Sequence, residues 1–133
     1  MKTVFRVQHK EQNVGPYVGG KISWDVEWYS RMMGHHANYS HPNLREDDLS
    51  VYSNSEYVCG FDSLDKLKSW FDGYLLNLID AGFIIAEYQV EGYIIGISGK
   101  QVVFIPTTFK DITFTLIQSY RHEDSHIPQR CFA

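Results

Sequence analysis

The chain has little cysteine and no long apolar run. Cys59 and Cys131 are its only cysteines. The first residues, Met1–Arg6, lack the apolar stretch of a secretory signal. Residues 83–97 are rich in apolar side chains, but acidic and amide residues interrupt them, so they do not predict a membrane span. We therefore expect a cytoplasmic protein with free thiols that does not enter a membrane.

A basic region and a phosphate-binding motif are also missing. The formal net charge is −4, and no strong block of one sign interrupts the sequence. This balance argues against sequence-independent binding to nucleic acid phosphates. The chain has no glycine-rich phosphate-binding motif, internal repeat or low-complexity segment. A mildly acidic protein can still bind a basic patch on another protein.

Apolar and aromatic residues, in contrast, are abundant. They make up 44% and 15% of the chain, which is typical of a globular protein because disordered chains are poorer in aromatic residues. A length of 133 residues suits one domain with a real core, and we predict a single domain over residues 1–133. Nine tyrosines and eight phenylalanines favour a β-containing fold with partly exposed aromatic surfaces.

Hydrophobic periodicity predicts a strand, a short helix, a second strand, a longer helix and then several strands in a row. The polar stretch 35–54 predicts a long loop, which is usually functional or mobile, and we expect a mobile tail at about 121–133. Residues 109–120 fit either a strand or a helix. The predicted strands are 3–9, 55–61, 83–90, 93–97 and 101–105, and the predicted helices are 24–33 and 63–81.

The segment 63–81 is the main predicted helix. Asp62 or Ser63 suits its N-cap, Gly73 could divide it in two, and Gly82 is its natural stop. The order of elements lacks the βαβα alternation of a doubly wound fold. It predicts an α+β fold: a mostly antiparallel sheet with the main helix at about 63–81 and a short N-terminal helix packed on it.

Two clusters of histidines have spacings that metal sites also show, but we predict no metal site at either. His122–His126 matches the H-E-x-x-H pattern of zinc peptidases, but Pro128 follows at once and the intervening residues favour helix poorly. His35, His36 and His41 could hold a divalent ion if their loop folded back on itself. Titratable surface groups on a solvated loop are the favoured interpretation.

The acidic run Glu46–Asp48 and Cys59 each have a functional and a structural interpretation. The run could bind a basic partner, although short charge runs are usually solvated. Cys59 precedes a predicted helix start, where a thiol can become reactive. Because it sits in an apolar strand without a neighbouring histidine, a buried structural cysteine is favoured.

Polar residues at strand edges are the best indication of a site. Apolar alternation that suddenly carries Arg6, His9 or Gln101 is unusual for a strand that only packs. On the plainer interpretation, Arg6 is a surface residue, His9 ends its strand and Gln101 follows a turn. Both interpretations remain open on the sequence.

Several short motifs between residues 4 and 105 resemble a group of small uncharacterised proteins of tailed bacteriophages and prophages. The resemblance brings no known activity with it. The motifs are Phe5-Arg6-Val7-x-His9-Lys10, Gly15-Pro16-Tyr17, His41-Pro42, Gly60-Phe61-Asp62-Ser63-Leu64-Asp65-x-Leu67-x-x-Trp70-Phe71, Ala81-Gly82-Phe83 and Lys100-Gln101-Val102-Val103-Phe104.

More distantly, the layout resembles compact ADP-ribosyltransferase-like domains, which use NAD. This resemblance implies that Arg6 or His9 would meet the ribose or phosphates and that Gln101 would orient the attacked ribose. It places Phe61 and Ser63 at the nicotinamide pocket. Transferases of this type usually have a glutamate where this chain has Gln101. The implied catalytic residues are Arg6, His9, Ser63 and Gln101, and the implied cofactor-binding residues are Tyr17 and Phe61.

Two functions from different classes remain open. The preferred one is a phage accessory protein that binds a host protein, such as a defence factor, and inhibits or redirects it without chemistry and without a cofactor. Its support is the small size, the acidic balance and the many tyrosines and tryptophans suited to interfaces. The alternative is an ADP-ribosyltransferase-like enzyme, or a degenerate nucleotide-binding domain, that uses NAD. The sequence leaves the oligomeric state open.

Overall fold

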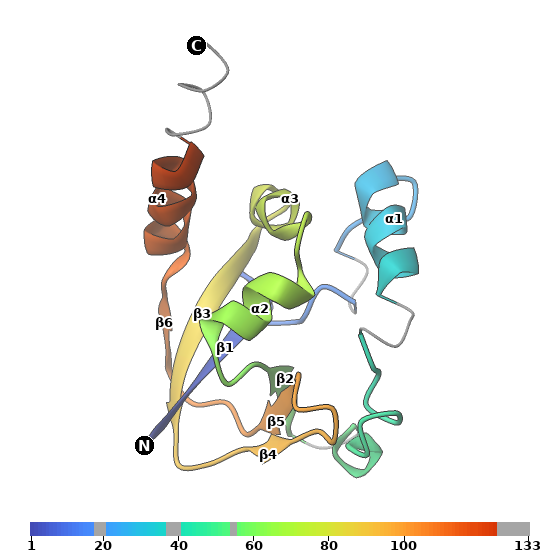
Figure 1. The fold of residues 1–133 in the computed structure, drawn as a ribbon, viewed down its shortest axis with the longest axis vertical. Coiled ribbons are helices and arrows are strands. Elements are labelled where there is room, and N and C mark those ends of the chain that lie inside the picture. The colour runs from blue at the N-terminus through green and yellow to red at the C-terminus, as the bar shows by residue number, and fades with distance from the viewer. Residues whose placement is uncertain (18–20, 37–40, 54–55, 125–133) are drawn as a thin grey trace.

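The computed structural model describes residues 1–17, 21–36, 41–53 and 56–124. It confirms an α+β fold, which has two small antiparallel sheets and four α-helices among the described residues (Figure 1). The first sheet has the order β1-β3-β6, formed by Lys2–His9, Phe83–Val90 and Phe109–Asp111. The second has the order β2-β5-β4, formed by Val58–Gly60, Val102–Phe104 and Ile94–Ile95. All pairings between these strands are antiparallel.

The long pair β1–β3 is the centre of the molecule. Its register runs from Lys2 opposite Val90 to His9 opposite Phe83. The two sheets are joined where Phe5 and Phe61 exchange both backbone hydrogen bonds, each 2.8 Å long. Since side chains alternate along a strand, one face of β1 turns to the helices and the other to the second sheet. Both faces are therefore buried.

The helices are α1 (Glu27–His35), α2 (Leu64–Trp70), α3 (Leu75–Asp80) and α4 (Thr113–Asp124), with a short 3₁₀ turn η1 at Ser50–Tyr52. The predicted helix 63–81 is thus divided into α2 and α3, because Gly73 adopts φ +84° between them. Ser63 caps α2 as expected, its Oγ accepting a hydrogen bond from the Lys66 amide at 3.1 Å. Gly82, at φ +100°, follows α3.

Two other boundaries differ from the sequence expectation. The helix expected at 24–33 begins only at Glu27, because Ser23 closes a turn first, accepting from the Val26 and Asp25 amides. The helix also continues beyond 33, through Gly34 to His35. The ambiguous segment 109–120 contains both alternatives, since β6 is followed by α4. Residues 121–124 of the expected tail are helical, and residues 125–133 lie outside the described part of the chain.

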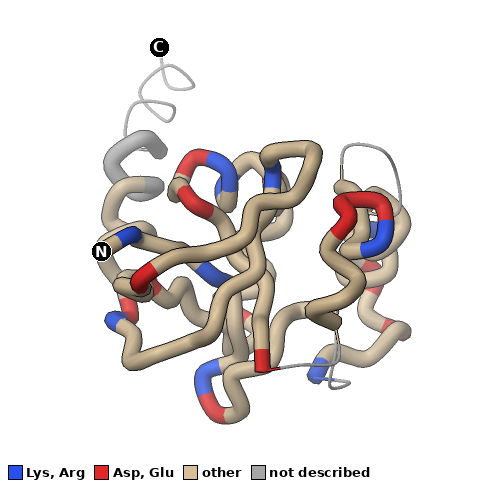
Figure 2. Tube along the Cα trace, turned by 90° about the horizontal axis from the view of Figure 1, so that it is seen from below, with Lys and Arg blue, Asp and Glu red and all other residues tan. Residues whose placement is uncertain are grey.

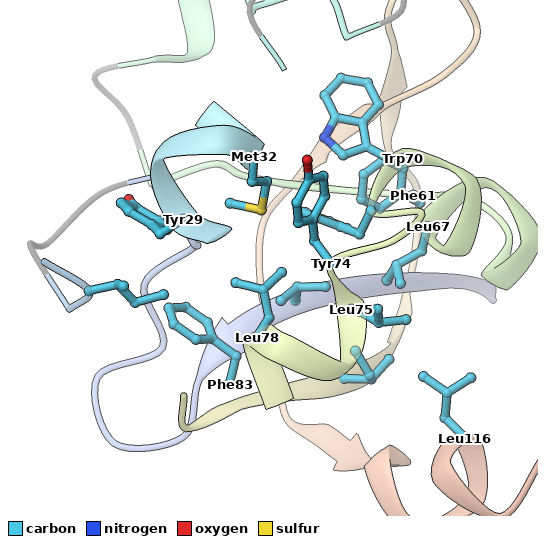
Figure 3. Packing of buried hydrophobic residues seen from close by; sticks show 14 residues of the cluster. Tyr29, Met32, Phe61, Leu67, Trp70, Tyr74, Leu75, Leu78, Phe83 and Leu116 are labelled. Atoms are coloured by element: carbon cyan, nitrogen blue, oxygen red, sulfur yellow. The ribbon is translucent and has the colours of Figure 1, made fainter. Parts of the chain in front are cut away.

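Two apolar clusters fill the spaces on either side of β1–β3. Figure 3 shows the larger one, where Tyr29 and Met32 of α1 face side chains from α2, α3 and β3. Leu67, Leu78 and Ile85 are fully buried there. The smaller cluster lies between the two sheets and contains Val4, Ala86, Tyr88, Val90, Val102 and Phe104. The short N-terminal helix therefore packs on the main helical region, as expected.

Gly60 marks the closest approach of the two sheets. A Cβ at this position would lie 2.7 Å from Val4 Cγ1, 2.8 Å from Phe104 Cε1 and 2.9 Å from the Phe5 carbonyl oxygen. We predict that Gly60→Ala lowers the free energy of unfolding by about 2–3 kcal/mol, because the sheets must separate. Gly92→Ala is the matched control, since nothing lies within 4 Å of its Cβ position. Urea denaturation of both variants checks this, and equal stabilities would contradict it.

Candidate functional site

A cleft of about 690 Å³ opens beside the first sheet. This volume lies in the range of small-ligand sites, and most of the lining is apolar or aromatic, as in such sites. Its walls come from β1, β2, the end of α2, the turn at Gly15–Tyr17 and the segment 41–53. In Figure 1, α1 and this segment lie on the opposite side of β1 and β3 from α4.

Four of the six residues proposed from the sequence line this cleft, and two do not. Arg6, Tyr17, Phe61 and Gln101 are brought together there, although they are far apart in the chain. His9 lies at the far end of β1, where its ring meets Phe83 edge-on. Ser63 is occupied as the cap of α2.

Arg6 lies in the floor of the cleft and is only 9% exposed. Its Nη1 donates to the Cys59 carbonyl at 2.7 Å and its Nη2 to the Asn13 carbonyl at 3.2 Å. Burial lowers the pKa of the guanidinium, although the nearby Cys59 and Tyr88 side chains act in the opposite direction. The interpretation of Arg6 as a surface strand residue is therefore wrong.

Arg6 has no acidic partner among the described residues. The two ion pairs found there join Arg31 to Glu27 and Lys66 to Asp62. A buried guanidinium is normally paired with a carboxylate, because desolvating a charge is costly. The polar neighbours of Arg6 are neutral instead: Asn13 also contacts Gln8, whose amide oxygen accepts from Tyr88.

Aromatic rings and histidines form one wall of the cleft, which we call the aromatic wall: Tyr17, His36, His41, Phe61, Trp70 and Phe71. Trp70 is its centre. Its Nε1 donates to the Tyr17 hydroxyl at 2.8 Å, and its carbonyl accepts from His41 Nε2 at 2.8 Å. The rings of His36 and His41 are stacked with centroids 4.0 Å apart.

His36 joins the aromatic wall through Tyr17. The indole of Trp70 can only donate, so the Tyr17 oxygen accepts from it, and the same hydroxyl is hydrogen-bonded to His36 Nδ1. Burial, followed by the neighbouring His41 and His35, lowers the pKa of His36 to about 4. Burial of the Tyr17 hydroxyl raises the pKa of that group.

Of the two histidine clusters, only the one at His35, His36 and His41 lies within the described residues. In the described part of the chain, no three or more His, Cys, Asp or Glu side chains are arranged to hold a metal ion. His35, His36 and His41 instead contact Tyr74, Tyr17 and Trp70. The H-E-x-x-H pattern is not tested, because His126 lies outside the described residues.

Asp47 holds the segment 41–53 in place, a role that the sequence analysis missed. Its side chain is buried, with 1% exposed. The carboxylate accepts hydrogen bonds from the Ser98 amide at 2.7 Å, the Ser98 hydroxyl at 2.9 Å and Gln101 Nε2 at 2.9 Å. The acidic run is therefore not a continuous acidic patch, since its middle residue points inward.

A local signal could have indicated this turn. Asn43 Oδ1 accepts from the Glu46 amide at 2.9 Å, and Glu46 Oε1 accepts from the Asn43 amide at 3.2 Å. This reciprocal pair is a capping box, which the Asn-x-x-Glu spacing suggests. Gly96 is the second signal. Its Cβ would lie 2.3 Å from the Asp47 carboxylate, so a residue without a side chain is needed there.

Gln101 completes the attachment of this segment. It is 6% exposed, and its Nε2 also donates to the Pro42 carbonyl at 2.7 Å. The position requires a donor, because both partners are acceptors. A glutamate would place a second carboxylate against Asp47. The departure from the transferase-like pattern thus has a structural cause.

Cys59 lines the cleft from β2, and its carbonyl holds Arg6. Burial raises the pKa of its thiol, and the nearby Arg6 only partly opposes this. A raised pKa disfavours the thiolate that nucleophilic chemistry needs. The raised pKa argues against a reactive thiol, but Cys59 is half-buried at the cleft and not fully buried as expected.

The comparisons with known proteins place the chain in a phage family. The family model described as Bacteriophage T4 Y00F protein matches residues 1–118. The chain therefore belongs to this family of bacteriophage proteins. Neither a curated protein nor a solved structure matches it. The expected phage family is confirmed, whereas none of these comparisons supports the ADP-ribosyltransferase-like layout. Among the described residues, no helix has the length and hydrophobicity to cross a bilayer.

We predict that Gln101→Glu lowers the free energy of unfolding by about 3 kcal/mol, because two carboxylates and the Pro42 carbonyl would face one another. Gln101→Met, which removes the donor without adding charge, should cost less, about 1–2 kcal/mol. Adding Asp47→Asn to Gln101→Glu should recover part of the loss, since an amide can donate to the new carboxylate. Chemical denaturation measures all three. A fully stable Gln101→Glu variant would refute this role.

We predict that stability falls as the pH drops from about 6.5 towards 4. In this window the unfolded chain protonates His36, whereas the folded chain keeps it neutral. Stability is thus complete above the unfolded pKa and is lost as the pH falls. The change should be roughly 1–2 kcal/mol, because His36 is only partly buried. His36→Gln, which keeps an acceptor for Tyr17, should flatten this part of the profile in denaturation experiments from pH 4 to 7.

Proposed function

We propose that this phage protein acts in the host cell as an accessory protein that binds a host protein at the cleft, without chemistry, and thereby inhibits or redirects it. The single observation that carries this proposal is the cleft itself, which is large and half-open and combines the aromatic wall with one buried cation. Aromatic residues and arginine are the side chains that dominate binding at interfaces.

The chemistry of the cleft also favours binding over catalysis. Ser63, which the transferase-like layout places at the nicotinamide pocket, is outside the cleft and occupied as a helix cap. The donor group of Gln101 is occupied by Asp47 and Pro42. Neither side chain is therefore free to form a hydrogen bond with a substrate ribose. The NAD-using alternative has no specific geometric support.

A nucleic acid is a poor candidate for the partner. Basic and acidic positions are interspersed along the described chain, with no broad basic region (Figure 2). Phosphate backbones bind mainly through several lysines and arginines in one area. Arg6 is the only lysine or arginine among the described residues that line the cleft. A protein partner fits this charge distribution better.

We predict that immobilised protein captures a partner from a lysate of the bacterial host and that Tyr17→Ala abolishes the capture. Tyr17 is 39% exposed and belongs to the aromatic wall, so its ring is available to a partner. Phe114→Ala is the matched control: Phe114 is 72% exposed on α4, away from the cleft, and its removal should leave the capture intact.

Mass spectrometry identifies the captured protein, and circular dichroism checks that both variants fold. Capture that survives Tyr17→Ala but not Phe114→Ala would place the binding surface on α4 instead. If wild-type protein retains no host protein at all, the proposal of a host-protein partner fails.

A further inference from the structure

Arg6 is the one feature of the cleft that the packing of the protein does not account for. Its guanidinium is buried, yet it donates only to the carbonyls of Cys59 and Asn13. An arginine side chain has five N–H groups in a planar fork, and these two hydrogen bonds leave others available. No hydrogen bond of the Nε group is found among the described residues. Arg6 is one of the residues that line the cleft.

The charged residues around Arg6 indicate how much negative charge a ligand in the cleft can carry. No other lysine or arginine is found among the cleft-lining residues described, and Glu46 lies at the same cleft. His36 is neutral. One cation balances one negative charge, whereas a nucleoside diphosphate or triphosphate carries several. Phosphate sites also use glycine-rich loops or helix N-termini, and the capped start of α2 is not part of the cleft.

The shape of the cleft indicates what surrounds that charge. A guanidinium suits a carboxylate, because its fork matches the two oxygens. The aromatic wall lines the same cleft with apolar ring faces, and Gly15 lies close to the guanidinium, since a Cβ there would be 3.6 Å from Nη2. The cleft is half-open, so a peptide segment can enter it. A second cavity, which Arg6 also lines, has a volume of about 230 Å³ and is too small for such a segment.

We propose that Arg6 is the anchor of a peptide-binding cleft, and that it pairs with a single carboxylate of the host protein, carried next to an aromatic or aliphatic side chain that packs on the aromatic wall. This inference rests on the proposed function, since it names the chemistry of the partner segment at the same site. The pair would supply the counter-charge that Arg6 lacks among the described residues.

The experiment starts from peptides rather than from a lysate. Selection of a random peptide library on the immobilised wild-type protein should enrich sequences with Asp, Glu or a free C-terminal carboxylate beside an apolar residue. Calorimetry then measures the best peptide and its amide analogue, in which Asn or Gln replaces the acid. The amide should bind about tenfold more weakly or worse, because a charge-assisted hydrogen bond is lost.

Variants of the protein, measured with the same acid and amide peptides, complete a double-mutant cycle. Arg6→Met keeps the apolar stem and should weaken the acidic peptide about tenfold or more, while the acid and amide peptides should then bind equally. Arg31→Met is the matched control, because Arg31 is an exposed arginine of α1 that does not line the cleft. It should leave binding unchanged. Should Arg6→Met fail to fold, the comparison of acid and amide peptides on wild-type protein still decides the inference.

Several results would overturn the inference. They are enrichment without acidic residues, equal binding of the acid and amide peptides to wild-type protein, or unchanged binding to folded Arg6→Met. Tight binding of ADP that depends on Arg6 would assign the cleft to a nucleotide instead. If the protein binds such peptides but captures no host protein, the proposed function fails and this inference stands. If Arg6→Met still captures the host protein, this inference fails and the proposed function stands.

Discussion

The contact between Asp47 and Gln101 is the interaction on which the cleft depends. The segment 41–53 has few apolar side chains of its own to hold it against the sheet, with Leu49 as its main buried hydrophobic residue. It is attached through polar groups instead, which join Asp47 and Pro42 to the second sheet. A buried polar network stabilises one arrangement only when all of its members are satisfied. Here the Asp47 carboxylate has three donors.

This attachment links the second sheet to the site. Gln101 immediately precedes β5, and Ser98 lies in the turn between β4 and β5, so the hairpin positions both donors at once. β5 in turn pairs with β2, whose Cys59 carbonyl orients Arg6. The wall and the floor of the cleft therefore share one framework. A change at Gln101 reaches Arg6 through two strands rather than through direct contact.

Local features of this fold could be predicted from the sequence, and long-range ones could not. The alternation in β1, the Ser63 cap and the stop at Gly82 each depend on neighbours in the chain, and they were predicted correctly. The inward position of Asp47 depends on Ser98 and Gln101, which lie more than 50 residues away. From the sequence, Asp47 was one member of an acidic run. Composition alone could not reveal the direction of one side chain.

The candidate site shows the same division. Arg6 and Gln101 stood out because polar residues interrupt strand patterns, whereas Tyr17 and Phe61 were proposed only from the transferase-like resemblance. All four line one cleft. His36 was expected on a solvated loop and Trp70 within the helix 63–81, and Tyr17 joins the two in the aromatic wall. His9 and Ser63 stood out equally, but local structure explains both. Polar residues that interrupt a strand pattern therefore indicated the region of the cleft. They did not distinguish a residue that contacts a ligand from one that caps a helix.

The buried charge of Arg6 costs the fold desolvation energy, and a stabilising role does not explain why it is there. Val4 and Gln8 share its face of β1 and are fully buried without any charge. Replacing a buried charged group by an apolar one of similar size is often neutral or stabilising. The carbonyls of Cys59 and Asn13 are weak compensation for a desolvated cation, as its lowered pKa indicates. A guanidinium kept at the floor of an apolar cleft is best explained by an anion that arrives from outside.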